Sequence, residues 1–272
     1  MKRSHWLIAP ILTVMLAAPI ATPFTSNNAD ALIKTQMVKA ATDTSSATTY
    51  TSAEKAAIED FQAQYASLSD SDNDLSVLYQ TEPNFSATFA PGVLSPTVIN
   101  KTVAWINYYR SLSGLPAISA STDSNDLAQI SSAVMAYAES DPYKNQHNLQ
   151  NTTKPINLPT LYWNRAILGT GESILYFGFP KTVGEPIREL MLDNTNISGM
   201  DAGHRAWFLS PFLSTVGVGI AKSQAGRYYE SVLVNNSPDR NRTPSSEIVS
   251  YPNNGVFPVE ELTAANGSTQ IP

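Results

Sequence analysis

The chain has 272 residues, long enough for one or two domains with a substantial hydrophobic core. Charged residues make up 15% of it, and 17 Lys and Arg against 23 Asp and Glu give a formal net charge of -6. This balance argues against nucleic acid as a partner, because phosphate recognition depends on clustered cations. Cysteine is absent, which excludes disulfides, thiolate metal sites and a cysteine nucleophile.

The N-terminus predicts an export signal. Lys2 and Arg3 precede an uncharged apolar stretch that runs from Trp6 to Ala21. We expect cleavage after Ala31, which defines residues 1–31 as the signal peptide; cleavage after Ala40 is the alternative. An uncleaved anchor is disfavoured, because the stretch is shorter than the ~20 residues of a membrane span. The mature protein is therefore expected to be secreted, extracellular or attached to the cell surface, without a transmembrane segment.

Helical patterns dominate the region after the signal. Residues 32–94 are interpreted as an N-terminal leader with a helical extension, in which apolar periodicity predicts a helix from Ser52 to about Ser67. The stretch from Ser69 to Pro91 is predicted to be loop. A domain over residues 95–235 then begins at Ser95-Pro96, where an N-cap residue precedes proline at the first helical position. Gly114 is placed to end this helix.

The rest of this domain changes from helical to extended patterns. Further helices are predicted from about residue 123 to before Pro142, over 183–193 and over 202–209, with a polar loop at 143–161. Residues 214–221 and 227–234 predict a β-hairpin. Residues 236–272 are interpreted as an extended C-terminal tail with short strands at 248–251 and 256–257. Helices followed by a hairpin favour an α+β fold, with helices covering a small antiparallel sheet.

Three residues stand out as chemical candidates. His147 lies on the polar loop, His204 lies directly before a helix, and Glu172 follows Gly171 in a glycine-rich turn. Histidine suits metal binding and proton transfer near neutral pH. Taken singly, His204 also fits a packed helix-terminal residue, and His147 fits a solvated surface residue. No G-x-S-x-G or H-E-x-x-H pattern is present, so no hydrolytic serine or catalytic residue is assigned.

The order of short motifs is more specific than any one of them. An N-Y-Y-R stretch with Gly-Leu-Pro at 107–116 is followed by Gly-Glu-Ser-Ile at 171–174, Gly-His-Arg at 203–205 and Val-Gly-Val-Gly at 216–219. This series resembles the CAP superfamily, or SCP domain, which includes cysteine-rich secretory proteins, antigen 5 and pathogenesis-related proteins. The resemblance covers about Ser95 to Val234. It is closest to the cysteine-free bacterial branch, and we expect a Gram-positive source.

The resemblance implies an α-β-α sandwich with a cleft that holds two histidines and two acidic residues. By motif, His147 resembles the first histidine, Glu172 the glutamate of Gly-Glu-Asn and His204 the second histidine. Asp193 takes the place of the second acid, with Glu185 and Glu189 as competing choices. Ser173 replaces the family asparagine, and an aspartate replaces a glutamate; both departures put a metal site in doubt.

The family further implies a non-enzymatic protein that binds a ligand in this cleft. A lipid, a sterol or a cell-wall component is the partner class, and we expect a monomer. Two imidazoles with a carboxylate suit Zn²⁺ or another divalent cation, which makes His147, His204 and Glu172 the predicted ligands. Alternatively, the four side chains only hydrogen-bond to one another. Two other functions stay open: an extracellular metal-assisted hydrolase, in which metal-bound water or Glu172 attacks a peptide or cell-wall glycan, and a cell-surface interaction protein.

Overall fold

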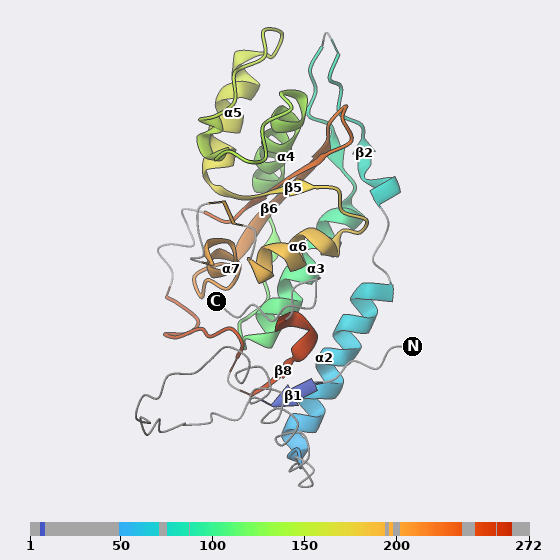
Figure 1. Ribbon diagram of the computed structural model, residues 1–272, viewed down its shortest axis with the longest axis vertical. Helices are drawn as coiled ribbons and strands as arrows, with labels where there is room; N and C mark the ends of the chain where they lie inside the picture. Colours follow the sequence, from blue (N-terminus) through green and yellow to red (C-terminus); the bar gives the residue numbers. More distant parts are fainter. Residues whose placement is uncertain are drawn as a thin grey trace, which may run out of the picture.

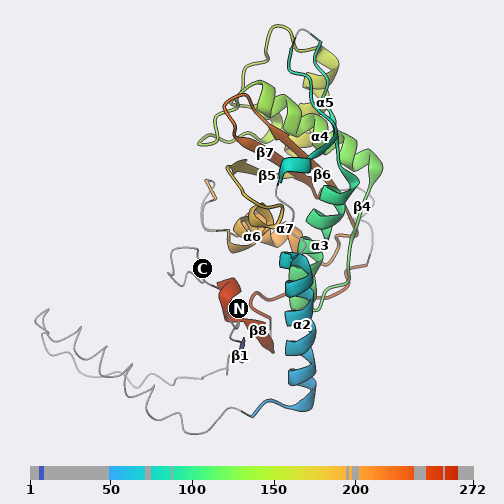
Figure 2. The same ribbon diagram turned by 90° about the vertical axis from the view of Figure 1, so that its right-hand side faces the viewer.

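A four-stranded sheet lies between two layers of helices (Figures 1 and 2). The computed structural model describes residues 6–8, 49–70, 75–86, 88–193, 196–197, 202–235, 243–253 and 255–262. The strand order is β4-β6-β7-β5, so β5 is an edge strand. The strands are β4 (Ser119–Ala120), β5 (Ser173–Gly178), β6 (Thr215–Lys222) and β7 (Tyr228–Leu233). β4 runs parallel to β6 and the other pairs are antiparallel, so the sheet is mixed and not purely antiparallel as predicted.

The two helix layers bury opposite faces of this sheet. In Figure 1, α4 and α5 lie above the sheet, and α3, α6 and α7 lie below it. The helices are α3 (Pro96–Leu112), α4 (Thr122–Tyr137), α5 (Thr160–Gly171), α6 (Gly184–Leu192) and α7 (Gly203–Phe208). Successive strand residues face opposite sides of the sheet. Tyr176 and Ile220 therefore join the core between the sheet and α3 and α6, whereas Leu175 and Tyr229 join the core between the sheet and α4. The predicted α-β-α sandwich is confirmed.

The Val-Gly-Val-Gly motif explains how closely α4 packs on the sheet. A Cβ atom at Gly217 would collide with the backbone of Ser124, and one at Gly219 would collide with the backbone of Ala128. Only glycine allows α4 to approach β6 this closely. The motif is therefore a packing signal for the upper layer.

The Arg-x-x-x-Gly-Leu-Pro motif fixes the lower layer. Arg110 is fully buried on α3 and donates hydrogen bonds to the carbonyls of Pro116, at 3.0 Å, and Phe208, at 2.7 Å. The Phe208 carbonyl belongs to the last turn of α7, where it lacks a partner within the helix. Arg110 thus connects the centre of the core to α7, the helix that carries His204.

Most predicted helices and the predicted hairpin are present, and the structure adds elements that were not predicted. The predicted N-terminal helix is α2 (Ser52–Asp70), and the helix begun by Ser95-Pro96 ends before Gly114, which has φ +67°. Helix α5 and strand β5 were not predicted, because the Gly169-Thr170-Gly171 stretch was interpreted as a turn. The predicted loop before Pro91 contains a 3-10 turn (Leu75–Val77) and β2 (Tyr79–Thr81), which pairs with β3 (Val93–Leu94).

The C-terminal region contributes to the core. Strand β8 (Val256–Pro258) is buried and pairs with β1 (Trp6–Ile8), and a 3-10 turn follows at Val259–Leu262. Residues 248–251, predicted as a strand, form no strand. The predicted cleavage sites at Ala31 and Ala40 lie outside the described residues. No helix in the described ranges is both long enough and apolar enough to cross a membrane.

Candidate functional site

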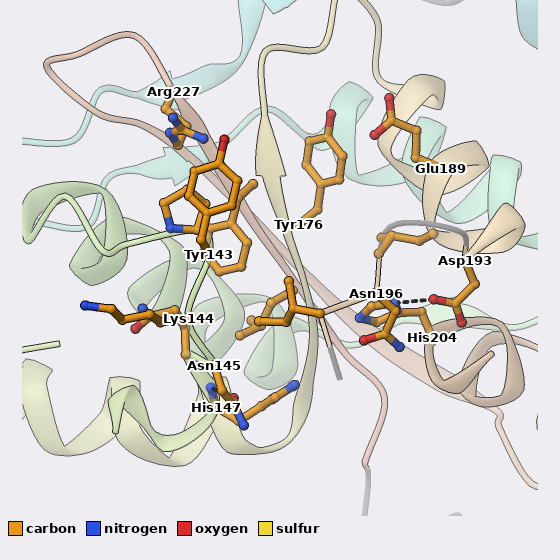
Figure 3. Close-up of a pocket in the computed structure, with 16 residues that line it drawn as sticks. Tyr143, Lys144, Asn145, His147, Tyr176, Glu189, Asp193, Asn196, His204 and Arg227 are labelled. Carbon is orange, nitrogen blue, oxygen red and sulfur yellow. Dashed lines mark hydrogen bonds and ion pairs between the residues drawn. The ribbon is translucent and has the colours of Figure 1, made fainter. Parts of the chain in front are cut away.

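A cavity of roughly 240 Å³ lies beside the edge strand β5, between the two helix layers (Figure 3). One wall comes from the loop 142–147, which follows α4, and the other from α6, α7 and the residues Asp193, Asn196 and Ile197. Three of the four predicted site residues line this cavity: His147, Asp193 and His204. Side chains that are distant in the sequence therefore meet at one site, because β5 has no neighbouring strand on this side.

Asp193 and His204 form a buried pair at the junction of α6 and α7. The Nδ1 atom of His204 lies 2.7 Å from Oδ1 of Asp193, whose side chain is fully buried. Oδ2 of Asp193 accepts the backbone N–H of Arg205 at 3.2 Å. Burial by itself raises the pKa of Asp193, but the His204 hydrogen bond and charge and the backbone N–H groups outweigh it and hold this pKa below its ordinary value. The aspartate is therefore ionised at neutral pH.

His147 is held by a backbone carbonyl. It begins a 3-10 turn (His147–Leu149), and its Nδ1 lies 2.9 Å from the carbonyl oxygen of Thr170. That carbonyl belongs to the last turn of α5, where it has no partner within the helix. Gly171 permits this approach, because a Cβ atom there would collide with the side chain of Asn148.

These contacts fix the same tautomer in both neutral rings. A carbonyl oxygen and an ionised carboxylate only accept hydrogen bonds, so Nδ1 carries the proton in His147 and in His204. Nε2 then remains as an acceptor nitrogen in each ring. The cavity therefore offers two imidazole nitrogens that can bind a hydrogen-bond donor or a metal.

Unusual backbone conformations occur beside both histidines. Asn148 and Leu149, directly after His147, have φ values of 57° and 51°. Asp193 has φ 54°, and Ala202, two residues before His204, has φ 53°. Leucine and alanine rarely adopt this left-handed region, and such strain is concentrated at functional sites. The surrounding contacts therefore hold both histidine segments in place at an energetic cost.

Glu172 does not line the cavity. It follows α5 as the C-cap residue, and its carbonyl oxygen accepts the backbone N–H groups of Val234, at 3.1 Å, and Asn235, at 3.2 Å. Its side chain is half-buried. Glu172 is thus two residues from the carbonyl that holds His147, and its backbone connects α5 to the end of β7.

The cavity is also lined by Tyr143, Tyr176 and Arg227, which were not singled out from the sequence, and by Glu189, which was a competing choice for the second acid. Tyr143 is 83% exposed at the cavity mouth, and Arg227 lies next to it in Figure 3, with its guanidinium 5.0 Å from the ring of Phe179. Across the cavity, the side chains of Tyr176 and Glu189 face each other. Desolvation raises the pKa of Glu189. Tyr143 lies four residues before His147 in the same loop, and this position could have indicated that it lines the site. No feature of the sequence indicated Arg227.

The described residues do not complete the predicted metal site. No group of three or more histidines and acids in the described part of the chain is arranged to hold an ion. Asp193 engages Nδ1 of His204, as a carboxylate does behind a metal-bound histidine, but this leaves only two nitrogen donors at the cavity. A protein zinc site has at least three protein ligands. Metal binding by His147, His204 and Glu172 stays a prediction.

The comparison with protein families agrees with the fold and the motifs. Residues 103–236 match the family model of CAP, the cysteine-rich secretory protein family. The matched region is a CAP domain, and its sandwich has the architecture expected of this family. A comparison with curated proteins gives no match.

Proposed function

We propose that the chain is a secreted CAP protein that binds a ligand through His147 and His204 without transforming it. The observation that carries this proposal is the shared cavity, in which Nδ1 of each imidazole lies within hydrogen-bond distance of an acceptor oxygen. The hydrolase alternative would need either a serine or other hydroxyl that is hydrogen-bonded to His204, or a complete metal site. Neither is found among the contacts of the described residues. The interaction-protein alternative has no specific observation in its favour.

The cavity favours a small polar ligand group. Its volume of roughly 240 Å³ is below the ~300–1,000 Å³ of pockets that enclose drug-sized molecules. Its walls include imidazole, carboxylate, amide and guanidinium groups, which a sterol or lipid skeleton would desolvate without replacing their hydrogen bonds. Among the expected partners, we therefore propose a sugar or peptide end of a cell-wall polymer, in preference to a sterol or lipid.

Calorimetry with soluble peptidoglycan fragments tests this function. We expect binding to the full chain and a loss of about tenfold or more in affinity for His147→Ala and for His204→Ala, because each imidazole contributes a hydrogen bond worth ~1.4 kcal/mol or more. Lys222→Ala, an exposed residue of β6 outside this cavity, is the matched control. Binding that survives both histidine substitutions, or binding of sterol-containing vesicles alone, contradicts the proposal.

Export has its own test. If the signal is cleaved as predicted, mass spectrometry of the protein from the culture medium finds a chain that begins at Leu32 or at Ala41. Full-length protein that keeps Met1 and stays in the cells would contradict secretion.

A further inference from the structure

Arg205 holds the end of α6 and the beginning of α7 together. Its backbone N–H donates to Asp193, and its guanidinium Nη1 donates to the carbonyls of Met191, at 3.0 Å, and Leu192, at 3.4 Å. These carbonyls lie in the last turn of α6, where they need partners outside the helix. A buried arginine thus fixes the segment that carries Asp193 to the segment that carries His204.

The face of this guanidinium is covered by a residue from outside the family match. The centre of the Arg205 guanidinium lies 4.7 Å from the centroid of the Tyr251 ring. The Tyr251 ring packs edge-on against Phe257 at 5.0 Å, and its hydroxyl donates to the carbonyl of Glu261 at 2.8 Å. Tyr251 is therefore held from two sides while it covers Arg205.

A second contact joins the same C-terminal region to the middle of α6. The Arg188 guanidinium lies 3.4 Å from the carboxylate of Glu261 and donates to the carbonyl of Glu260 at 2.8 Å. Glu261 is 2% exposed and also accepts the hydroxyl hydrogen of Tyr109 on α3 at 2.8 Å. Truncating one partner of such a buried pair is costly, because the other charge is left without compensation.

We propose that residues 243–253 and 255–262, here called the C-terminal segment, position the Asp193–His204 pair of the cavity. Tyr251 acts through Arg205 at the junction of α6 and α7, and Glu261 acts through Arg188 on α6. Both are positioning residues, since neither lines the cavity. The cavity therefore depends on a part of the chain that lies beyond the matched residues 103–236.

Nuclear magnetic resonance of the full chain with ¹⁵N-labelled histidine tests this role. The readouts are the tautomer and the water-exchange rate of the Nδ1–H proton in each ring. For Tyr251→Leu we expect the exchange of the His204 proton to rise roughly tenfold and its ring to populate both tautomers, because a desolvated cation–aromatic contact is lost. His147 is the control within the molecule, since the Thr170 carbonyl holds it, and its signals stay unchanged.

Two further variants separate positioning from general stability. Tyr251→Phe keeps the ring over Arg205 and restores the wild-type His204 signals. Tyr228→Leu removes a similar contact, in which Lys222 lies 5.2 Å from the Tyr228 ring, and leaves both histidines unchanged. The proposal is overturned if Tyr251→Leu leaves His204 as in the wild type, or if Tyr228→Leu disturbs it equally.

Glu261→Gln decides the case in which Tyr251→Leu does not fold. Glutamine keeps the shape and the contact to Tyr109 but removes the charge that faces Arg188. Faster exchange at His204 with an unchanged His147 supports the proposal, and unchanged exchange at His204 overturns it. These measurements use no ligand, so their result is independent of whether the cavity binds one.

Discussion

His204 and His147 lie on two walls of one cavity, and different groups hold their imidazole rings. On the His204 wall, an ionised carboxylate accepts a hydrogen bond from the ring N–H at the junction of two helices. On the His147 wall, a backbone carbonyl accepts a hydrogen bond from the ring N–H at the end of α5. A carboxylate can be neutralised by acid or by substitution, whereas a carbonyl keeps its acceptor at every pH. The hydrogen bond that holds the ring is therefore expected to weaken when its acceptor is neutralised on the His204 wall, whereas the acceptor on the His147 wall cannot be neutralised.

Glu230 affects the stability of both walls and gives the largest expected effect. This residue of β7 lies opposite Tyr176 of β5 and is 1% exposed, and its Oε1 has no hydrogen-bond partner among the described residues. Burial raises its pKa from 4.5 to about 8.

The folded state binds this proton more tightly than the unfolded state, so stability falls as the pH rises from 4.5 to about 8. Glu230→Gln should raise the free energy of unfolding by on the order of 3 to 5 kcal/mol at pH 8, and by little at pH 4.5. Urea unfolding at the two pH values measures this difference. An equal effect at both pH values would contradict the raised pKa of Glu230. The variant could then not serve as a stabilised background in which the two walls are compared.

Asp193→Asn should break the His204 wall. The amide cannot accept from both the imidazole and the Arg205 N–H as a carboxylate does, so we expect a loss of about 1–3 kcal/mol at neutral pH. The lowered pKa of Asp193 stabilises the fold above its ordinary value of 3.8, and this contribution disappears as the pH falls below it. Urea unfolding between pH 7 and pH 3 follows both effects.

Asp141→Asn is the matched control, since this aspartate next to the opposite wall is 40% exposed, lies 3.4 Å from Lys144 and accepts the backbone N–H of Tyr143. We expect it to change stability much less than Asp193→Asn does, because solvent screens an exposed ion pair. Equal losses for the two variants would contradict the contrast between the walls.

His147→Ala should have a smaller effect on stability. It removes one hydrogen bond to a carbonyl at a half-buried position, for which about 1 kcal/mol is typical. Combined with Asp193→Asn, its effect should add within about 0.5 kcal/mol, because the two residues have separate anchors. A larger coupling energy in this double-mutant cycle would show that the walls are not independent.

Zinc should have the smallest effect. Two nitrogens bind an ion weakly, and a ligand at its dissociation constant stabilises the fold by only ~0.4 kcal/mol. Melting scans with zinc and with a chelator are therefore expected to differ by ~2 °C or less. A larger shift that His147→Ala and His204→Ala abolish would show that both histidines bind the ion with a further ligand.

Local signals in the sequence predicted much of the fold. Ser95-Pro96 and Gly114 mark the limits of α3, and the change from helical to alternating periodicity at Pro211 precedes β6 and β7. Helix α5 was missed because Gly169 and Gly171 suggested a turn. Both lie in the last turn of this helix, where a Cβ atom would displace the side chains of Ser131 and Asn148. Tertiary contacts thus decided the conformation.

The candidate site was predicted from the order of the motifs and not from local helix or strand signals. Three of the four residues indicated by the motifs line one cavity. His204 and Asp193 line it together because α6 and α7 meet end to end, a geometry that no local pattern encodes. The Gly-Glu motif indicated Glu172, but its backbone contacts β7 and its side chain does not line the cavity. The contribution of Tyr251 and Glu261 was not predictable, since both act through arginines from a region interpreted as tail.

The most direct test of the central claim follows the Nε2 resonances of ¹⁵N-labelled His147 and His204 while soluble peptidoglycan fragments are added to the full chain. The two imidazoles are predicted to act as acceptors in one cavity. Both Nε2 signals should therefore shift with the same dissociation constant, while both Nδ1 nitrogens keep their protons. Shifts at only one of the two histidines, or different dissociation constants for the two, would contradict a shared site.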